Sequence, residues 1–487
     1  MDIQRIKTLG QLKAAGYEPK GLKQEMRANL VRKLRNKDQV FEGIIGFDDT
    51  VLPDIERAVL SGHNILLLGL RGQAKTRIAR LMTALLDEYM PIVSGSELND
   101  DPLHPLSKYA IDLIQEHGDE TPVTWVHRDE RYVEKLATPD VSIADLIGDV
   151  DPIKAANLKL PYSDERVIHF GLIPRSHRSI FVINELPDLQ ARIQVSLFNI
   201  LQERDLQIRG FKLRLPLDIA FVFTANPEDY TNRGSIITPL KDRIESQILT
   251  HYPKSIETAM EITAQEARIP SEQKDKIEVP HIHRKLIEMI SFNARKSEYV
   301  DEKSGVSARL SISALENLYS TAERRMLING EQSTVTRITD FWGVVPAITG
   351  KIELVYEGEQ EGPYNVALSL LFKSLRELFT EYFPNPNQKI RREAKDEYGV
   401  IKAWFAGGNT VDLINDAPDT EYINTLKSVA GLDKLTMGYM PADGQVPVFM
   451  ELVLHGLSES EVIGKNILEN SLNFSDPLSG MLSDLDN

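Results

Sequence analysis

A loop that could bind a polyphosphate lies at residues 69–76, "GLRGQAKT", between an apolar run and a helical pattern. It matches the phosphate-loop pattern G-x-x-x-x-G-K-[ST], except that Ala74 stands in place of the last glycine. Gly69 and Gly72 would let the backbone turn its N–H groups toward the phosphates. Lys75 would contact the β- and γ-phosphates, and Thr76 would coordinate Mg²⁺. Ala74 costs little if its φ stays negative; the alternative is a lysine that merely begins a helix after a tight turn.

A second candidate lies at the end of the apolar run "SIFVINE", residues 179–185. Glu185 would orient or deprotonate an attacking water. The position before it, which normally holds an aspartate that binds Mg²⁺ through water, is Asn184. An amide keeps an acceptor oxygen of similar reach and loses the negative charge. Alternatively, this is a core strand whose end happens to carry Asn and Glu.

A third polar residue follows the apolar run "IAFVFTANP", where Asn226 precedes a proline. Alone it would more often be a turn residue. A functional role for Asn226 is favoured by the order along the chain, in which a phosphate loop and an acidic strand end come before this polar strand end. An amide beside the Glu185 strand could hold the attacking water against the γ-phosphate.

The elements that must position these residues form an alternating pattern. Strands are predicted at "NILLLGL", "TPVTWVHRD", "SIFVINE" and "LDIAFVFTANP", with helical periods between them, which predicts a parallel sheet covered on both faces. Residues 92–120 are predicted to be an insertion, and 206–216 a hairpin that turns at Arg209 and Gly210. After about residue 250 helical patterns dominate, and "SISALENLYSTAERRM" is predicted to begin with a capping box at Ser313.

Composition limits the function classes. A net charge of −16 argues against general affinity for nucleic acid or an anionic membrane, which needs a basic face. The absence of cysteine excludes disulfides, zinc–thiolate sites and thiol catalysis. The beginning of the chain has no signal-peptide pattern, and its apolar runs are far shorter than the ~20 residues that span a bilayer. The sequence therefore predicts a cytoplasmic protein. The "HIH" at 281–283 does not have the spacing of a helical metal pair.

Taken together, these motifs resemble the AAA+ ATPases of the branch that holds MoxR-type proteins and the ATPase subunit of magnesium chelatase. The resemblance covers roughly residues 41–350. It is carried by "GLRGQAKT", "GLIPRSHRSIFVINELPDLQARIQVSLFNILQERDLQIRG", "FVFTANPED" and "TPLKDRIESQI". Members of this branch often carry alanine before the loop lysine. The resemblance implies an α/β P-loop core with a parallel sheet flanked by helices, followed by a helical lid and a mostly helical C-terminal region. The expected divisions are an N-terminal helical segment (1–40), the core (41–250), the lid (251–356) and an extension of unknown role (357–487).

The resemblance also implies roles for single residues. Asn226 matches the sensor-1 position, and Arg243 in "PLKDRI" matches the arginine finger that acts on a neighbouring subunit's nucleotide. Arg309 in "GVSARLSI" resembles the sensor-2 arginine, although Ala308 stands where proline is common. Without the resemblance, Arg243 would be a salt-bridged surface residue and Arg309 a helix-start residue. The remaining nucleotide-binding positions implied are the loop residues Arg71 and Gln73 and the adenine-packing residues Ile44, Ile45 and Gly46.

The function implied is an ATP- and Mg²⁺-dependent ring motor, expected as a hexamer, that remodels a partner protein. In this branch the partner usually carries a von Willebrand factor A domain, and the work is often metal insertion or complex maturation. The alternative is a nucleotide-binding switch subunit that barely hydrolyses ATP, because Asn184 lacks the carboxylate. DNA remodelling is disfavoured by the net charge. Arg209, Lys212 and Arg214 of the hairpin would contact a pore or a partner, or simply be solvated.

Overall fold

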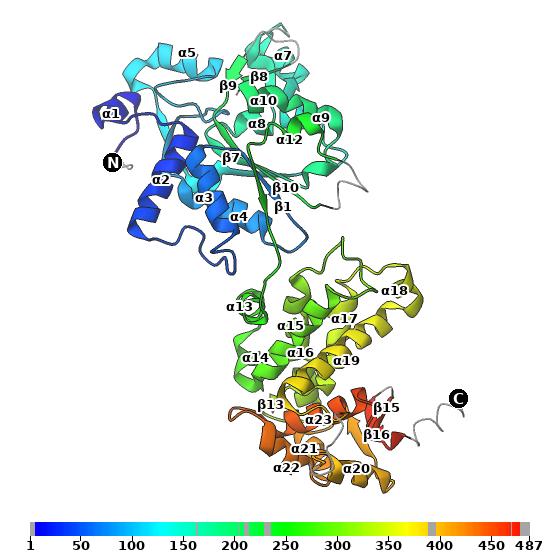
Figure 1. The fold of residues 1–487 in the computed structure, drawn as a ribbon. Helices are drawn as coiled ribbons and strands as arrows, with labels where there is room; N and C mark the ends of the chain where they lie inside the picture. The colour runs from blue at the N-terminus through cyan, green and yellow to red at the C-terminus, as the bar shows by residue number, and fades with distance from the viewer. Residues whose placement is uncertain are drawn as a thin grey trace. The chain divides into compact units, whose positions relative to one another are not determined.

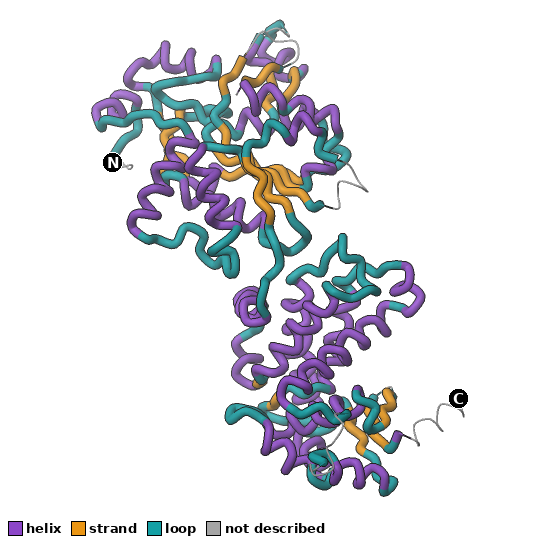
Figure 2. The backbone as a smooth tube through the Cα atoms, in the orientation of Figure 1, coloured by secondary structure: helices purple, strands orange, loops and turns teal. Residues whose placement is uncertain are grey.

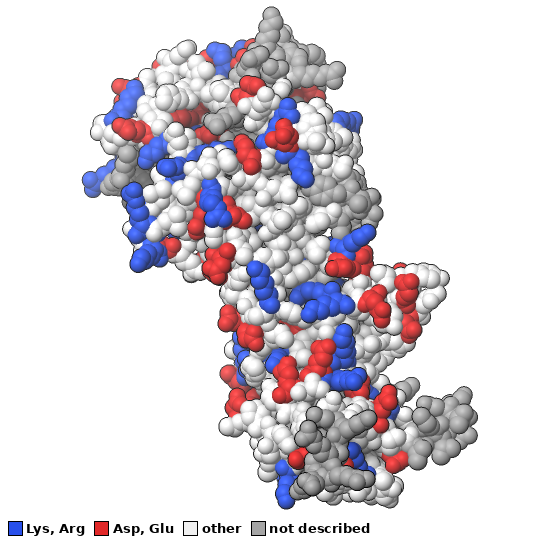
Figure 3. Space-filling view, in the orientation of Figure 1, with Lys and Arg blue, Asp and Glu red and all other residues white. Residues whose placement is uncertain are grey.

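The computed structural model describes residues 5–161, 164–203, 205–208, 214–227, 235–387, 396–468 and 470–477. The chain divides into two compact units, Met1–His251 and Tyr252–Asn487 (Figure 1). The long strands lie in the first unit, and helices dominate the second (Figure 2). On the face drawn in Figure 3, basic and acidic side chains are interspersed. No helix of the described residues is long and apolar enough to cross a membrane.

The first unit is built on a five-stranded sheet in which every neighbouring pair of strands is parallel. Its order is β11 (Ser246–Leu249), β1 (Ile65–Leu68), β10 (Ile219–Ala225), β7 (Ser179–Asn184) and β4 (Tyr132–Leu136). The strands β1, β7 and β10 are buried along their whole length, as expected for a parallel sheet covered on both faces. Such a sheet flanked by helices confirms the fold class predicted from the sequence.

Alternate side chains of the strands enter two separate cores. In β1, Ile65 and Leu67 pack into one core, and Leu66 and Leu68 into the other. This follows from the two-residue period of a strand, which points successive side chains to opposite faces. The first core is completed by α2 (Leu22–Asn36), α3 (Val51–Ser61) and α4 (Lys75–Leu81). The second is completed by α8 (Leu172–Arg175), α9 (Ala191–Ser196), α10 (Phe198–Glu203) and α12 (Thr238–Lys241) (Figure 1).

One strand predicted from the sequence is present but does not belong to the central sheet. The segment "TPVTWVHRD" forms β3 (Val123–His127), which pairs antiparallel with β2 (Tyr89–Val93) instead of joining the central sheet. One of the two edge strands of that sheet is β4, which was not predicted because its five residues include two charges. Periodicity identifies a strand but not its partner, and here α1 (Leu9–Ala14) packs on β3 in a small core of its own.

The remaining elements of the first unit surround this framework. The predicted hairpin is present, since β8 and β9 pair antiparallel. Arg209 and Lys212 lie outside the described residues, as does the side chain of Arg214. The other elements are η1 (Met82–Leu85), α5 (Lys108–His117), η2 (Gly118–Glu120), η3 (Arg128–Arg131), α6 (Ile143–Leu146), β5 (Gly148–Val150), α7 (Pro152–Leu158), η4 (Glu165–Val167), β6 (Ile168–Phe170), η5 (Leu186–Asp188), β8 (Asp205–Gln207) and β9 (Arg214–Pro216).

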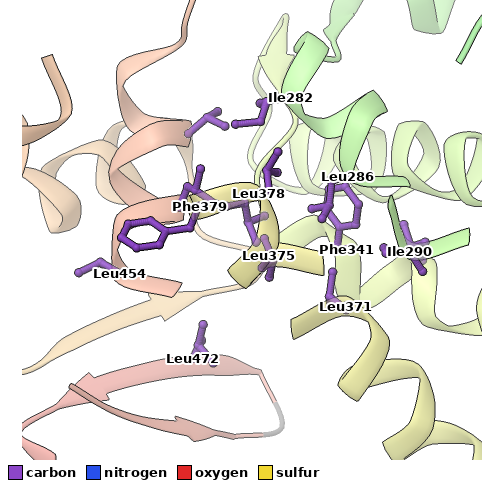
Figure 4. Packing of buried hydrophobic residues seen from close by; sticks show 14 of the residues in the cluster. Ile282, Leu286, Ile290, Phe341, Leu371, Leu375, Leu378, Phe379, Leu454 and Leu472 are labelled. Atoms are coloured by element: carbon purple, nitrogen blue, oxygen red, sulfur yellow. The ribbon is translucent and has the colours of Figure 1, made fainter. Parts of the chain in front are cut away.

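The second unit is mostly helical and has one continuous hydrophobic core. In α19 (Pro363–Tyr382), Leu375, Leu378 and Phe379 lie between α15 (His281–Ala294) and α23 (Val446–Glu459) (Figure 4). A Cβ on Gly456 of α23 would lie 2.1 Å from the ring of Phe379, so the close approach of these helices requires glycine.

The other elements of the second unit are α13 (Ile256–Glu266), α14 (Ser271–Lys276), β12 (Ile277–Glu278), α16 (Arg309–Ile328), β13 (Thr334–Val335), η6 (Thr339–Val344), α17 (Val345–Thr349), α18 (Tyr356–Glu361), α20 (Gly399–Ala406), β14 (Val411–Ile414), α21 (Asp419–Lys427), α22 (Leu432–Tyr439), β15 (Gly464–Ile467) and β16 (Ser471–Ser475). The capping box predicted at Ser313 is wrong. Helix α16 begins at Arg309, one turn earlier, because the apolar stripe extends back to Leu310.

A group of buried charges, here called the arginine cluster, ties α16 to the elements around it. It consists of Arg325, Arg337, Asp340 and Asp419. Arg325 is 1% exposed, and all five of its N–H groups donate: two to Asp340, one each to Thr334, Asp419 and the carbonyl of Val335. Because every donor of Arg325 is bonded, its charge can be buried.

Candidate functional site

The phosphate-loop segment lies at the carboxyl end of β1, beside the end of β10. Leu68 is in register with Ala225, and the N–H of Gly69 donates to the carbonyl of Ala225 at 3.2 Å. A Cβ on Gly69 would lie 2.0 Å from Oγ1 of Thr250 and 2.3 Å from Oε1 of Gln73. Those two side chains are themselves hydrogen-bonded at 2.6 Å. Glycine is therefore required at position 69 for packing against the residue that follows β11.

The loop has a left-handed residue on each side of Gln73. Gly72 has a φ of 74° and Ala74 a φ of 57°. Alternating conformations of this kind turn successive N–H groups to one concave side, which suits an anion. The condition under which Ala74 would cost little, a negative φ, is not met, because the loop must reverse immediately before α4 begins. A left-handed alanine costs roughly 1–2 kcal/mol. Arg71, by contrast, is exposed to solvent.

Lys75 is buried and turned back toward the strand ends. Its Nζ donates to the carbonyl of Leu70 at 2.9 Å, to Oδ1 of Asn226 at 2.7 Å, and to the carbonyl of Gly69. The side chain is 8% exposed. The bond to Asn226 follows from the sheet order, since β10 is the neighbour of β1 and Asn226 comes directly after β10.

Asn226 also connects this lysine to the predicted catalytic carboxylate. Its Nδ2 donates to Oε2 of Glu185 at 2.9 Å. Glu185 follows β7 with φ 55° and ψ 49°, and its N–H donates to Oγ1 of Thr224 at 3.2 Å. A left-handed glutamate is a strained conformation of the kind that clusters at functional sites. The structure thus brings together Lys75, Asn226 and Glu185, the three residues whose order along the chain suggested a common site.

Asn184 lies at the end of β7, 7% exposed, among oxygen atoms. Its Oδ1 accepts from Oγ1 of Thr224 at 3.0 Å and, at 3.5 Å, from Oγ1 of Thr76. Its Nδ2 donates to Oε1 of Glu134 on β4. We call the set Lys75, Thr76, Glu134, Asn184, Glu185, Thr224 and Asn226 the strand-end cluster.

The strand-end cluster fits Mg²⁺ in the nature of its donors. Hydroxyl, amide and carboxylate oxygens of Thr76, Asn184 and Glu185 are the hard ligands that this ion prefers. Among the described residues no group of three or more His, Asp and Glu side chains is placed to hold a metal by itself.

Of the other predicted residues, Ile44, Ile45, Gly46 and Arg243 belong to the first unit and Arg309 to the second. Ile44 is 5% exposed and belongs to the core against which Ala74 packs, while Ile45 is partly exposed and Gly46 has a φ of 80°. Arg243 donates to Gln202 at 3.1 Å and to the carbonyl of Pro239 at 2.6 Å, with its guanidinium 4.6 Å from the ring centroid of Phe198. Arg309 is the first residue of α16 in the second unit.

Three residues of the site region were not predicted from the sequence: Thr224, Thr250 and Glu134. Thr224 has a weak signal, being the only hydroxyl in an otherwise apolar strand. No signal in the sequence identifies Thr250 or Glu134. Thr250 follows β11 and Glu134 lies inside β4, and neither strand was predicted.

Comparisons with known proteins give low similarity. The chain matches no protein-family model. It is similar to one chain of the complex between subunits BchI and BchD of magnesium chelatase, at 20% identity over 66% of this chain and 98% of that one, with a TM-score of 0.34. It is also similar to NtrX from Brucella abortus in complex with ATP (14% identity, 60% and 53% of the two chains, TM-score 0.34). A third similarity is to the closed state of Hsp104 with ATPγS and casein (14% identity, 66% and 52%, TM-score 0.37). The chain spans about half the length of the last two, and with TM-scores this low the functional argument rests on the geometry of the strand-end cluster.

Proposed function

We propose that this chain binds and hydrolyses ATP as an AAA+ ring motor of the MoxR and magnesium-chelatase type. The observation that carries the proposal is the hydrogen-bonded series Lys75–Asn226–Glu185 at the carboxyl edge of a parallel sheet. Ligands of open α/β sheets bind at this edge. A lysine, an amide and a carboxylate there supply a cation for phosphate, a water-positioning group and a base.

Each residue has a distinct task in this proposal. The N–H groups of the loop and the amino end of α4 attract the phosphates, and Lys75 exchanges Asn226 for a phosphate oxygen. Glu185 accepts a proton from the attacking water, or orients it, while Asn226 holds that water in line. Mg²⁺, when bound with the nucleotide, neutralises charge on the β- and γ-phosphates. Ile44, Ile45 and Gly46 pack on the adenine.

The proposal extends to assembly. Arg243 acts as a finger on the nucleotide of a neighbouring subunit, which requires head-to-tail contacts and hence a closed ring, taken here as a hexamer. Arg309 contacts the nucleotide from the second unit, and hydrolysis moves that unit against the first. The chain works in the cytoplasm on a client with a von Willebrand factor A domain, and the work is metal insertion or complex maturation.

Steady-state ATP turnover of the wild type and of Glu185→Gln tests the catalytic assignment. We expect the variant to bind ATP and to turn it over ~10²- to 10⁴-fold more slowly, the range for loss of a general base. Glu97→Gln is the matched control, because Glu97 is a half-exposed glutamate of the same unit that pairs with Lys154 at 3.4 Å. Equal turnover in all three proteins, or none in any with excess Mg²⁺ and partner, would refute the assignment.

A nucleotide-dependent switch with little hydrolysis is the second candidate, and Asn184 is the observation that favours it. Losing a carboxylate near the metal costs about 10- to 100-fold in metal affinity or activity where such outer ligands have been removed. Under this alternative, Asn184→Asp greatly raises turnover and lowers the Mg²⁺ requirement. Under the motor proposal, the wild type already turns over and the substitution gains little.

A further inference from the structure

The amide of Asn184 has a carboxylate as its neighbour, on a strand that the known motifs do not include. Glu134 lies in β4, and its Oε1 accepts a hydrogen bond from Nδ2 of Asn184. The side chain of Glu134 is 25% exposed, so it lies at the margin of the site and not in the core. The carboxylate is missing at position 184, and the amide that stands in its place is hydrogen-bonded to a negatively charged side chain.

Sheet register explains why this contact forms. β4 runs parallel to β7, with Glu134 opposite Val182 and Leu136 opposite Asn184. Glu134 and Asn184 are therefore diagonal neighbours on one face, within reach of a long side chain. That face is the one covered by α4, since Val182 and Ile78 share its core. The same face thus carries Thr76, at the start of α4, and the acceptor oxygen of Asn184.

The contact fixes which way the amide points. A carboxylate can only accept hydrogen bonds, so the NH₂ group of Asn184 must face Glu134. The carbonyl oxygen then faces the hydroxyls of Thr224 and Thr76, at 3.0 Å and 3.5 Å. Without Glu134 the amide could rotate and present its NH₂ group, which repels a cation, to the metal side. The negative charge also polarises the amide and strengthens its oxygen as an acceptor.

Two further contacts hold Glu134 in this position. Tyr132 donates its hydroxyl to Oε2 at 3.0 Å, and Nη2 of Arg80 lies 3.0 Å from the same oxygen. Burial, and then the charge of Glu134, raise the pKa of Tyr132, so its phenol stays a donor. Arg80 is 67% exposed, so water screens this ion pair and Glu134 keeps much of its charge toward Asn184.

We propose that Glu134 is a positioning residue that replaces the missing carboxylate of the Mg²⁺ site. Asn184 supplies the acceptor oxygen, and Glu134 supplies the negative charge and locks the amide. The two residues together perform what one aspartate performs elsewhere. This inference rests on the proposed function, because it presupposes that Mg²⁺ and nucleotide bind at the strand-end cluster. It removes the main reason for regarding the site as inactive.

The first experiment measures metal affinity and not turnover. The full-length protein is titrated with Mg²⁺ in the presence of a fluorescent ADP analogue, and separately with Mn²⁺ and ADP by electron paramagnetic resonance. Glu134→Gln preserves shape and removes the charge. We expect the metal concentration needed for half-maximal binding to rise about tenfold, at the lower end of outer-ligand effects. Metal-free ADP binding should change less than about twofold, because no phosphate contact is lost.

The decisive comparison combines Glu134→Gln with Asn184→Asp. In the double variant a carboxylate returns to position 184, and the new amide at position 134 can donate to it. We expect metal affinity within about threefold of the wild type. In Asn184→Asp alone two carboxylates meet and the N–H donor is gone, so the metal requirement should not fall. The effect of Asn184→Asp therefore depends on which residue stands at position 134.

The outcomes separate this inference from the proposed function. If the wild type binds no nucleotide, both fail. If it binds nucleotide with Mg²⁺ dependence and Glu134→Gln matches both the wild type and the Glu97→Gln control, only the role of Glu134 fails. It also fails if Asn184→Asp tightens metal binding equally with and without Glu134. Circular dichroism and thermal unfolding without metal establish that each variant is folded, and Tyr132→Phe, which keeps the charge, should leave metal affinity within about threefold.

Discussion

Buried charges are stabilised in different ways in the strand-end cluster of the first unit and in the arginine cluster of the second. Arg325 has every N–H group bonded and two carboxylates against it, and no residue of that cluster has a positive φ. Lys75 is bonded to two backbone carbonyls and an amide, groups that a phosphate could replace. Two residues beside it, Ala74 and Glu185, are left-handed.

The difference separates structural charge from functional charge. A charge such as that of Arg325, whose donors are all bonded to protein groups that include two carboxylates, gains nothing from a ligand, and its removal leaves a carboxylate buried and unpaired. A cation that donates to backbone carbonyls and an amide next to strained backbone, as Lys75 does, can exchange those acceptors for an anion. We therefore expect substitutions in the arginine cluster to change stability and substitutions in the strand-end cluster to change binding.

The largest effect is expected from Arg325→Met. It leaves Asp340, 2% exposed, without its bidentate partner, so the free energy of unfolding of the second unit should fall by about 3–5 kcal/mol. Urea unfolding, with hydrogen exchange to assign the loss to the second unit, measures this. The adjacent Arg324→Met is the control, because its pair with Asp416 is exposed and should contribute less than about 1 kcal/mol. Equal losses in both variants would remove the distinction between the clusters.

Lys75→Met should lower nucleotide affinity and change the free energy of unfolding little. Loss of a charge-assisted bond to phosphate costs about 1.5–3 kcal/mol, equivalent to roughly 10- to 100-fold in nucleotide affinity. Titration with a fluorescent nucleotide measures this. The matched control is Lys108→Met, whose lysine pairs with Asp112 on α5 and should leave affinity unchanged. A large drop in stability together with unchanged affinity would place Lys75 with the structural charges.

Buried histidines give a pH test of the second unit. Burial lowers the pKa of His283 to about 3 from its ordinary value of 6.5. Below pH 6.5 the unfolded chain binds a proton at this position and the folded chain does not, so stability is lost as the pH falls from 6.5 toward 3. His283→Gln should flatten the pH dependence of unfolding by about 1.4 kcal/mol per pH unit between pH 6 and pH 4.

The comparison for that test is His177 in the first unit, whose pKa burial lowers to about 4. His177→Gln should flatten the acid dependence of the first unit and leave that of the second unchanged. Parallel pH curves for the wild type and His283→Gln would show that His283 titrates alike in the folded and unfolded chain.

The smallest effect is expected from Ala74→Gly. Glycine relieves the left-handed strain but gains entropy in the unfolded chain, so a net stabilisation of about 0.5–1 kcal/mol is expected. Thermal unfolding detects this as a higher Tm. Ala79→Gly, in the interior of α4 and fully buried, is the control and should lower stability by about 1 kcal/mol or more. A loss at both positions would indicate that the alanine side chain at position 74 packs favourably enough to outweigh the strain.

Much of the fold could be predicted because its strands are continuous apolar runs that end in polar residues. That pattern located β1, β7 and β10 and, with them, Lys75, Glu185 and Asn226. Strand β4 was not predicted because an edge strand, covered on fewer sides, tolerates charged residues and lacks a continuous apolar pattern. The positive φ of Ala74 could not be predicted, because it is set by the turn into α4 and not by the residue type.

The local chemistry could be predicted from the sequence alone: a loop able to face phosphates, a carboxylate at one strand end and an amide at another. This is possible because strand periodicity and loop composition are local properties of the chain. The position of β10 between β1 and β7, which joins Lys75 to Glu185 through Asn226, depends on the folded unit and has no signal in the linear sequence. The folded unit also places Glu134 beside Asn184 across 50 residues of sequence. Which side chains meet at a sheet edge depends on strand order and register, and these are set by the packing of the whole unit.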